Sequence, residues 1–265
     1  CSSDLFVYRG DVWVAPSEGG RATALTSHVE ADAYPVFSPD GKWVAFASRR
    51  NVGWDIFVVP ADGGPAQQIT WHSGAEYPGG WSPDGKQLLF AGRRESPNYA
   101  LYAVDLKSLA TTRLTEDYAA LNYPAFSPDG KSVVYGRYGF PWTRPRYTGA
   151  AAAQIWTLNL ADGRRKPLTS DDRQHLWTQF LPDGKRLLTV TVGEVTPSAS
   201  KLNEPIPKVI DSPARTPNLW VYELDGKGKP LTQFSGGAVR WPSVATKAGD
   251  IAFEYGPDLY LLKSG

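Results

Sequence analysis

The chain has 265 residues with a net charge of +1, so its charge gives no reason to expect nucleic-acid binding. No apolar run is long enough to span a membrane, and one cysteine with three histidines offers little for a Cys/His metal cluster. Ten tryptophans suit wide cores between packed sheets.

A turn of one type punctuates the chain. Its pattern is an aromatic residue, Ser or Leu, then Pro-Asp-Gly-Lys, and it occurs at residues 37–42, 81–86, 126–131 and 180–185. Pro presets φ at its position, and Gly accepts a positive φ, so each copy predicts a tight turn between two strands. The spacing of roughly 45–55 residues is typical of repeat architectures such as propellers.

Each repeat predicts four antiparallel strands. First strands are expected before the turns, as at residues 34–37 and 123–126, and second strands follow at residues 43–46, 87–90, 132–135 and 186–189. Third strands are expected at residues 55–59, 100–104, 154–158 and 218–222, and fourth strands at residues 67–70, 112–115, 166–169 and 229–232. Incomplete units are expected at residues 5–8, 11–14 and 22–26, and at residues 241–244, 250–253 and 258–262.

These elements predict an all-β fold: a six-bladed β-propeller of four-stranded antiparallel blades, with incomplete first and last blades, forming a single domain over residues 1–265. Both ends contain a second and a third strand, so no blade should mix the two chain ends. The middle strands are apolar on both faces, which favours stacked blades over a sheet with one wet face. A β-sandwich is the alternative, but it gives no reason for the repeated turn. Four middle-strand aromatics should be largely buried: Trp43, Phe57, Trp156 and Trp220.

A Pro-rich insertion at residues 193–217 separates the second and third strands of the fifth blade. Loops of this length are usually functional or disordered. Its prolines argue against a regular strand or a long helix.

Several segments carry a family resemblance. The turn repeats resemble the TolB-type, WD-repeat-like propeller. The chain most resembles the amino-terminal propeller of bacterial tricorn-like serine peptidases at residues 11–20, 25–28, 142–149, 154–156, 218–222, 231–234, 239–243 and 251–256. The resemblance implies a six-bladed propeller that gates the passage of peptides and is not itself the catalyst.

A search for catalytic patterns is largely negative. The sequence has no Gly-x-Ser-x-Gly elbow and no His-Glu-x-x-His motif, so we predict no catalytic residues, no cofactor and no metal. A Ser-His-Asp arrangement would be recognised only by its geometry. Three function classes stay open: a non-catalytic propeller that binds or scaffolds a protein or peptide, the gating propeller of a tricorn-like peptidase, and an enzyme with its site in the channel.

Polar and aromatic residues gather between the last predicted strand of one blade and the first strand of the next. If each blade begins with its innermost strand, these loops ring one mouth of the central channel. Solvated turn residues are the ordinary interpretation; a binding site for a basic peptide segment or a cation is the alternative. The predicted site comprises His28, Asp32, Tyr34, His72, Glu76, Tyr77, Asp117, Tyr123, Asp171, Asp172, His175, Trp177 and Arg240. The competing surfaces are the outer rim of the blades and the Pro-rich insertion.

The sequence begins Cys-Ser-Ser, which resembles a bacterial lipoprotein after signal cleavage. Lipidation of Cys1 would tether the domain to a membrane without spanning it. The alternative is that Cys1 is merely where this sequence starts. The resemblance favours a periplasmic or exported protein, and a cytoplasmic location stays open.

Overall fold

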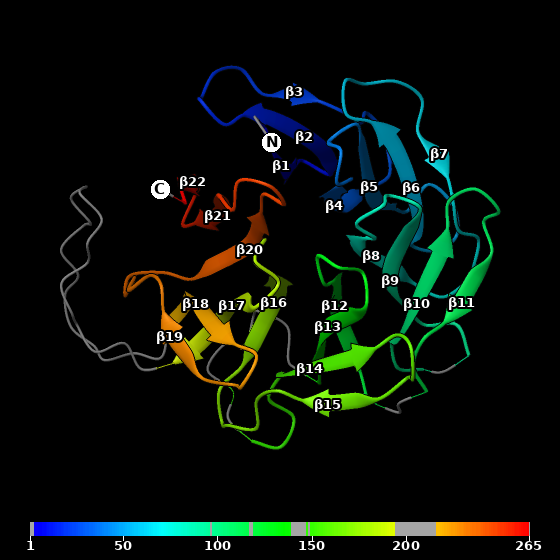
Figure 1. Ribbon diagram of the computed structural model, residues 1–265. Coiled ribbons are helices and arrows are strands. Elements are labelled where there is room, and N and C mark those ends of the chain that lie inside the picture. Colours follow the sequence, from blue (N-terminus) through cyan, green and yellow to red (C-terminus); the bar gives the residue numbers. More distant parts are fainter. Residues whose placement is uncertain are drawn as a thin grey trace. The chain divides into compact units, whose positions relative to one another are not determined.

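The computed structural model describes residues 3–95, 97–116, 119–138, 147, 149–193 and 216–264. Its strands form six antiparallel sheets (Figure 1). Sheet 1 contains β1 (Ser3–Tyr8), β2 (Asp11–Pro16) and β3 (Thr23–Ala24); sheet 2 contains β4 (Asp32–Phe37), β5 (Trp43–Ser48), β6 (Asp55–Pro60) and β7 (Gln67–Gln68). Sheet 3 contains β8 (Glu76–Trp81), β9 (Gln87–Gly92), β10 (Ala100–Asp105) and β11 (Thr111–Arg113).

The other three sheets repeat this order. Sheet 4 contains β12 (Leu121–Phe126), β13 (Ser132–Arg137), β14 (Gln154–Asn159) and β15 (Arg165–Pro167). Sheet 5 contains β16 (His175–Phe180), β17 (Arg186–Gly193), β18 (Thr216–Glu223) and β19 (Gly228–Pro230); sheet 6 contains β20 (Val239–Val244), β21 (Ile251–Tyr255) and β22 (Asp258–Leu262). The residues form two compact units, 1–135 with 158–164, and 136–157 with 165–265; sheets 1–3 lie in the first and sheets 5 and 6 in the second.

The predicted fold class is confirmed. Sheets 1 and 6 have three strands each, and no described sheet takes strands from both chain ends. The fourth strands are shorter than predicted, with two or three residues each. The insertion lies between β17 and β18, as expected, but Pro217 belongs to β18, where it pairs with Val192. Residues 194–215 lie outside the described residues, as does Cys1. The described part of the chain holds no helix with the length and hydropathy needed to cross a bilayer.

Side-chain hydrogen bonds explain the repeated turn. In the first copy, Ser38 Oγ donates to Asp40 Oδ1 at 2.6 Å and accepts from the Trp43 backbone N–H at 3.0 Å. The Lys42 N–H donates to the same carboxylate at 3.1 Å. The turns built on Ser82 and Ser127 repeat all three bonds. The Ser hydroxyl and the neighbouring backbone N–H hold the pKa of the turn aspartate below its ordinary value.

Replacing Ser82 with alanine is expected to raise the pKa of Asp84 toward its ordinary value of 3.8, because the hydroxyl is the largest influence lowering it. The folded-state pKa is depressed, so this turn contributes stability above the unfolded pKa and loses it as the pH falls through the folded pKa. Ser82→Ala should therefore weaken that acid-side loss. An NMR titration of the Asp84 carboxyl carbon measures the shift. Asp183 is the internal control because its turn carries Leu181 instead of Ser; an unmoved Asp84 would contradict the assignment.

A second repeated device closes five of the six sheets. The threonine that follows each fourth strand is buried, and its Oγ1 accepts a backbone N–H of the third strand at 2.9–3.0 Å. The donor is the second residue of that strand in sheets 1–4 and the fourth residue in sheet 5. The pairs are Thr26 with Val12, Thr70 with Ile56, Thr115 with Leu101, Thr169 with Ile155, and Thr232 with Leu219. We call this bond the threonine clamp. It joins the last segment of a sheet to its neighbour where the backbone ladder is very short.

The side chain of the residue just before the clamped N–H adds to the clamp in four sheets. It accepts the backbone N–H of the residue two positions after the threonine. The four pairs are Asp11 with His28, Asp55 with His72, Gln154 with Asp171, and Asn218 with Phe234. Aspartate, asparagine and glutamine share a side-chain carbonyl or carboxylate oxygen, which is the acceptor needed here.

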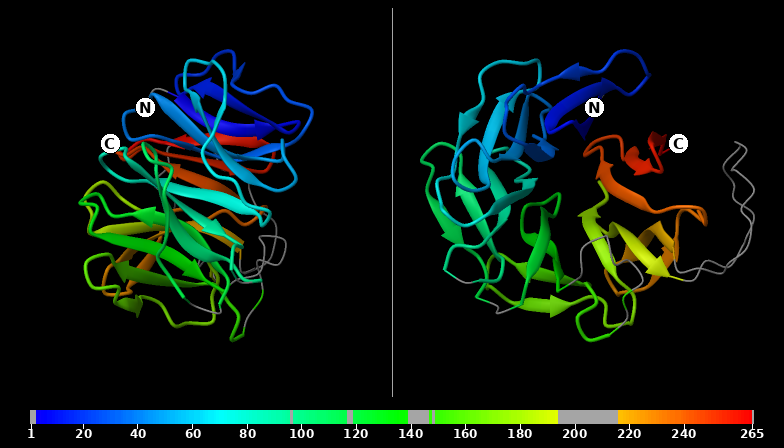
Figure 2. Two further views of the ribbon diagram at one scale, coloured as in Figure 1. Left: turned by 90° about the vertical axis from the view of Figure 1, so that its right-hand side faces the viewer. Right: turned by 180° about the vertical axis from the view of Figure 1, so that it is seen from behind.

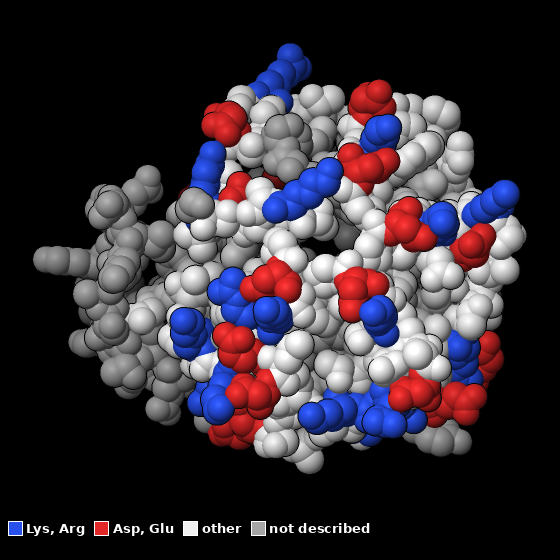
Figure 3. All heavy atoms as spheres, viewed as in Figure 1, with Lys and Arg blue, Asp and Glu red and all other residues white. Residues whose placement is uncertain are grey.

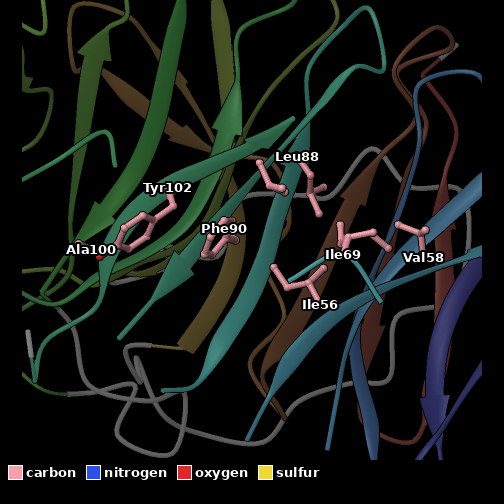
Figure 4. Packing of buried hydrophobic residues seen from close by; sticks show 9 residues of the cluster. Ile56, Val58, Ile69, Leu88, Phe90, Ala100 and Tyr102 are labelled. Atoms are coloured by element: carbon pink, nitrogen blue, oxygen red, sulfur yellow. The ribbon is translucent and has the colours of Figure 1, made fainter. Parts of the chain in front are cut away.

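The cores lie between successive sheets rather than inside one sheet. One apolar cluster joins sheets 1 and 2 and takes Val44 and Phe46 from β5, whereas Ala45 of the same strand enters a second cluster between sheets 2 and 3. The residues of β6 divide in the same way, with Ile56 and Val58 in the second cluster (Figure 4). Successive side chains of a strand point to opposite faces, so both faces of sheet 2 are buried.

First strands make the joints between sheets. Within the first unit, β4 contacts β1 and β2, and β8 contacts β4, β5 and β6 (Figure 2). The Trp81 indole N–H donates to the Val36 carbonyl across that joint at 3.2 Å. A Cβ on Gly79 would meet the Pro124 carbonyl oxygen at 2.3 Å, so glycine is required where β8 approaches β12. In the second unit, β20 contacts β16, β17 and β18.

The four middle-strand aromatics are buried to different degrees. Phe57 and Trp220 are each 6% exposed, as predicted. Trp43 and Trp156 are only partly buried. Trp43 begins β5, beside the turn, and Trp156 lies under the Arg137 guanidinium at 4.8 Å. The prediction is therefore confirmed in full for Phe57 and Trp220, and only in part for Trp43 and Trp156.

An irregularity recurs in the first strands. The register shifts within β4, β8, β16 and β20, which marks a β-bulge. An aromatic residue with a left-handed φ of 50–55° lies in β4, β12, β16 and β20: Tyr34, Tyr123, Trp177 and Trp241. Residues other than glycine rarely adopt this conformation. The left-handed conformation therefore recurs at the third residue of four first strands.

Candidate binding site

The predicted site residues lie mostly on first strands rather than in the loops before them. Each first strand begins before its aromatic residue, so Tyr34, Tyr77, Tyr123, Trp177 and Arg240 are strand residues. Asp32, Glu76 and His175 are the first residues of β4, β8 and β16 and are buried. His28, His72, Asp171 and Asp172 remain in the connecting loops. Asp117 lies outside the described residues.

Two of the predicted acids form buried ion pairs. Asp32 Oδ2 lies 2.8 Å from Arg50 Nη2, and Glu76 Oε1 lies 2.5 Å from Arg94 Nε, with both carboxylates fully buried. Each arginine also lies over two rings of its own sheet: Arg50 over Phe46 and Phe57, and Arg94 over Phe90 and Tyr102, at 5.2–5.4 Å. These acids are neutralised inside the protein and are not presented to a ligand.

Burial governs the ionisation of Glu76. Desolvation raises the pKa of Glu76, and the hydrogen bonds and charge of Thr70 and Arg94 only partly oppose this. A raised folded-state pKa means that the charged carboxylate is the form that the fold tolerates less well. This glutamate therefore depends on Arg94 at neutral pH.

Four half-buried rings form a continuous row at one end of sheets 2 and 3. Tyr34 and Tyr77 have ring centroids 4.7 Å apart, Trp54 lies 6.5 Å from Tyr34 and 5.9 Å from Tyr77, and Tyr99 lies 5.6 Å from Tyr77. Trp54 and Tyr99 each stand immediately before a third strand, so equivalent positions of two sheets supply them. Desolvation raises the pKa of Tyr34 and of Tyr77, so both remain neutral phenols at physiological pH.

Two exposed arginines complete this row. The Arg49 guanidinium lies 5.7 Å from the Trp54 ring centroid, and that of Arg93 lies 4.3 Å from Tyr99. Both arginines are exposed. We call Tyr34, Trp54, Tyr77, Tyr99, Arg49 and Arg93 the aromatic–arginine row. It offers flat apolar faces with a positive charge over two of its rings.

The histidines of the two amino-terminal loops have a structural role. His28 Nδ1 accepts the Glu30 backbone N–H at 3.1 Å, and His72 Nδ1 accepts that of Gly74 at 2.9 Å. Asp171 occupies the equivalent loop position and its Oδ1 accepts the Arg173 N–H at 2.9 Å. The recurrence of these residues therefore has a local cause: each closes a turn on the backbone two residues ahead.

His175 belongs to a hydroxyl–imidazole–carboxylate chain. Its Nδ1 lies 3.0 Å from Thr191 Oγ1 and its Nε2 lies 3.0 Å from Asp171 Oδ1. Partial burial raises the pKa of Asp171, but the hydrogen bonds and charges of His175 and Arg173 together leave this pKa lowered. Thr191 is 0% exposed, whereas the Asp171 side chain is 38% exposed. A nucleophile must reach its substrate. In a hydrolytic triad the hydroxyl would therefore be the exposed end, but here the hydroxyl of Thr191 is buried and the carboxylate of Asp171 is the exposed end.

Trp177 and Arg240, two further predicted residues, lie in smaller contacts. Trp177 packs against Trp241 with ring centroids 4.8 Å apart. Arg240 Nε lies 4.0 Å from Glu254 Oε2. The structure thus joins Tyr34 with Tyr77 in one unit, and Asp171 with His175 in the other.

The sequence interpretation included Tyr34 and Tyr77 but missed the other four members of the aromatic–arginine row. Each of the Arg-Arg pairs at 49–50 and 93–94 has one largely buried member, Arg50 or Arg94, and one exposed member over a ring, Arg49 or Arg93. A signal was present, since both pairs directly follow a second strand and both Trp54 and Tyr99 directly precede a third strand.

Neither a metal cluster among the described residues nor a single-sign charge patch on the face drawn in Figure 3 is found. No group of three or more His, Cys, Asp or Glu side chains in the described part of the chain could hold a metal ion. On the face drawn in Figure 3, lysines and arginines lie beside aspartates and glutamates. Nucleic-acid surfaces carry a stronger positive bias.

Six antiparallel sheets with repeated hairpin turns define a β-propeller module. Residues 3–265 match the family model of the Tricorn protease N-terminal beta propeller domain, and the chain belongs to this family. No curated protein matches the chain.

Solved structures agree on the fold. Tricorn protease is similar with a TM-score of 0.76 and 18% identity, covering 100% of this chain and 24% of that one. A putative TolB from Agrobacterium tumefaciens has a TM-score of 0.68 and 19% identity, covering 87% of this chain and 76% of that one. TolB from Acinetobacter baumannii has a TM-score of 0.65 and 20% identity, covering 92% of this chain and 57% of that one. At these identities the likeness shows the fold alone.

Proposed function

We propose that this propeller is a non-catalytic module that binds a protein or peptide segment through the aromatic–arginine row. The observation that supports this proposal is a set of four half-buried rings in contact with one another, with two exposed guanidiniums above them. Aromatic residues and arginine dominate the energetics of protein interfaces. The buried position of Thr191 supports the non-catalytic assignment.

The charge of the proposed partner differs from the expectation drawn from sequence. Asp32 and Glu76 were expected to attract a basic segment, but both are buried and paired. The exposed charges of the row are those of Arg49 and Arg93. An acidic segment that carries an aromatic or proline side chain fits this surface better, because carboxylates pair with the guanidiniums while apolar groups lie on the rings.

Replacing both Arg49 and Arg93 with alanine is expected to weaken binding of a fluorescent peptide of alternating Glu and Trp by about tenfold or more, since each guanidinium loses a charge-assisted contact. Fluorescence anisotropy measures the Kd. The control variant replaces Arg164 and Arg165, an exposed pair at the start of β15, and should bind as the wild type does. Equal binding by both variants, or preference for the matched Lys-Trp peptide, would contradict the proposal.

The second candidate is the gating propeller of a tricorn-like peptidase, and the family match favours it. The coding sequence beyond residue 265 discriminates the two, because gating requires a peptidase core in the same protein. The proposed exported location, with or without lipid on Cys1, is tested by fractionating cells and by mass spectrometry of the mature amino terminus.

A further inference from the structure

Sheets 1, 2 and 3 each present an exposed arginine at the same place. Arg9, Arg49 and Arg93 directly follow β1, β5 and β9, the strands that pair with the third strands β2, β6 and β10. Arg9 is exposed like the other two, and its guanidinium lies 5.3 Å from the centroid of the Tyr8 ring, which is 51% exposed. The aromatic–arginine row thus contains two members of a set of three, and Arg9 is the third.

A recurring backbone bond fixes these three positions to the next sheet. We call the segment between the second and third strands of a sheet its connection. The first residue of the next sheet's first strand donates its N–H to the last carbonyl of the connection. The three bonds are Asp32 to Gly10 at 2.7 Å, Glu76 to Trp54 at 2.8 Å, and Leu121 to Tyr99 at 3.1 Å. The connections therefore follow one another through the first unit in one repeated arrangement.

Two of the arginines are also fixed through their own backbone. The Arg49 N–H donates to the Ala31 carbonyl at 3.1 Å, and the Arg93 N–H donates to the Ala75 carbonyl at 3.0 Å. Ala31 and Ala75 directly precede β4 and β8, whose first residues make the bonds to the preceding connection. A two-residue segment therefore links each of these arginines to the connection of the sheet before it.

This arrangement sets the step between successive arginines. Packed sheets lie about 10 Å apart, and an extended chain advances about 3.3 Å per residue. An extended segment laid across the connections would therefore need about three or four residues to pass from one sheet to the next.

The exposed charge of the three connections is mainly positive. Glu95 lies in the connection of sheet 3, but its Oε2 lies 3.8 Å from Arg113 Nη1 and accepts the Tyr102 hydroxyl. Glu30, in the loop before β4, is exposed and opposes the arginines. Apolar side chains lie in the same region, since Val52 is 100% exposed and Val29 is 95% exposed.

We propose that Tyr8 and Arg9 form a third subsite beside the aromatic–arginine row, and that the partner is an extended segment with one acidic residue for each of sheets 1–3. This inference rests on the peptide binding proposed above. Each carboxylate would pair with one guanidinium. Acidic residues about every fourth position, with aromatic residues between them, match the step from sheet to sheet and the rings beside each arginine.

The test uses the 265-residue protein and fluorescent peptides that contain one, two or three copies of Glu-Ser-Trp-Ser. Fluorescence anisotropy should show that the affinity rises at least about fivefold with the second copy and again with the third. Arg9→Asn removes the charge with a residue that tolerates the left-handed φ of 54° at this position. This variant should lose the gain from the third copy. It should bind the two-copy peptide within about twofold of the wild type, because Arg49 and Arg93 remain.

Two matched variants and one peptide serve as controls. Arg21→Asn removes an exposed arginine at the opposite end of sheet 1, between β2 and β3, and should leave every affinity unchanged. Glu30→Gln should tighten binding of the three-copy peptide, because it removes a carboxylate that repels the segment. A peptide of the same composition with its three Glu residues adjacent should lose the gain from the third copy.

Three results would overturn the inference, and they are distinguishable. If Arg9→Asn binds the three-copy peptide as the wild type does while loss of Arg49 and Arg93 abolishes binding, the row binds peptides without a third subsite. If Arg9→Asn weakens the two-copy and three-copy peptides equally, Arg9 acts on the fold and not on the third acidic residue. If no peptide binds the wild type, the proposed function fails together with this inference.

Discussion

Replacing Arg94 with alanine should lower the free energy of unfolding by about 3–5 kcal/mol, the range for breaking a buried ion pair. The substitution leaves the fully buried Glu76 carboxylate without its cation and removes the guanidinium from the Phe90 and Tyr102 rings. Urea unfolding followed by fluorescence measures the change. The deficit should shrink as the pH falls toward the raised pKa of Glu76, because the neutral acid is cheaper to bury.

The matched control for Arg94 is its neighbour Arg93, which is exposed. Arg93→Ala should change stability by less than about 1 kcal/mol. The double variant Glu76→Gln/Arg94→Met should recover part of the loss, since it removes the uncompensated charge and keeps the volume. A double variant as unstable as Arg94→Ala would place the cost in packing rather than in the ion pair.

Replacing Trp220 with alanine should also be costly, by about 3–5 kcal/mol. Its ring is 6% exposed in the middle of β18, stacks on Tyr222 at 6.2 Å and lies under the Arg173 guanidinium at 5.1 Å. Thermal and urea unfolding both measure the loss. Trp71→Ala is the control, because Trp71 is 58% exposed and its loss should change stability by no more than about 0.5 kcal/mol. Equal effects of the two substitutions would mean that the Trp220 ring is not part of a core.

The hairpins and the order of the strands could be predicted because they depend on local chemistry. Pro, Asp and Gly set the turns, and the Ser38–Asp40 bond is built within a few residues. The number of repeats could then be predicted from the spacing of these turns along the chain. The incomplete first and last sheets were also predictable, because each chain end lacks one recognisable strand.

The site was harder because it depends on contacts between segments. The sequence predicts that Asp32 and Glu76 are exposed loop acids. In the structure both are buried, and Arg50 and Arg94 neutralise them. The histidines recur in sequence, but only the geometry shows that His28 and His72 each close a turn on their own loop. The left-handed φ of Tyr34 and Trp177 has no local signature, since bulky aromatics ordinarily avoid it. Burial and bulges arise from neighbouring sheets, and a single sequence does not encode them as a simple period.

Sheet 2 has no outer surface in the ordinary sense, because alternate residues of β5 and β6 enter two different cores. Each of its two faces forms part of a separate apolar core. Its stability is therefore a sum over neighbours, as in linear repeat proteins. An excised sheet would expose two apolar faces at once, so a fragment cut on either side of it should aggregate rather than fold. The same sharing limits evolution of the array, since a residue enlarged on β5 can be accommodated only by a change in the one sheet that its face meets.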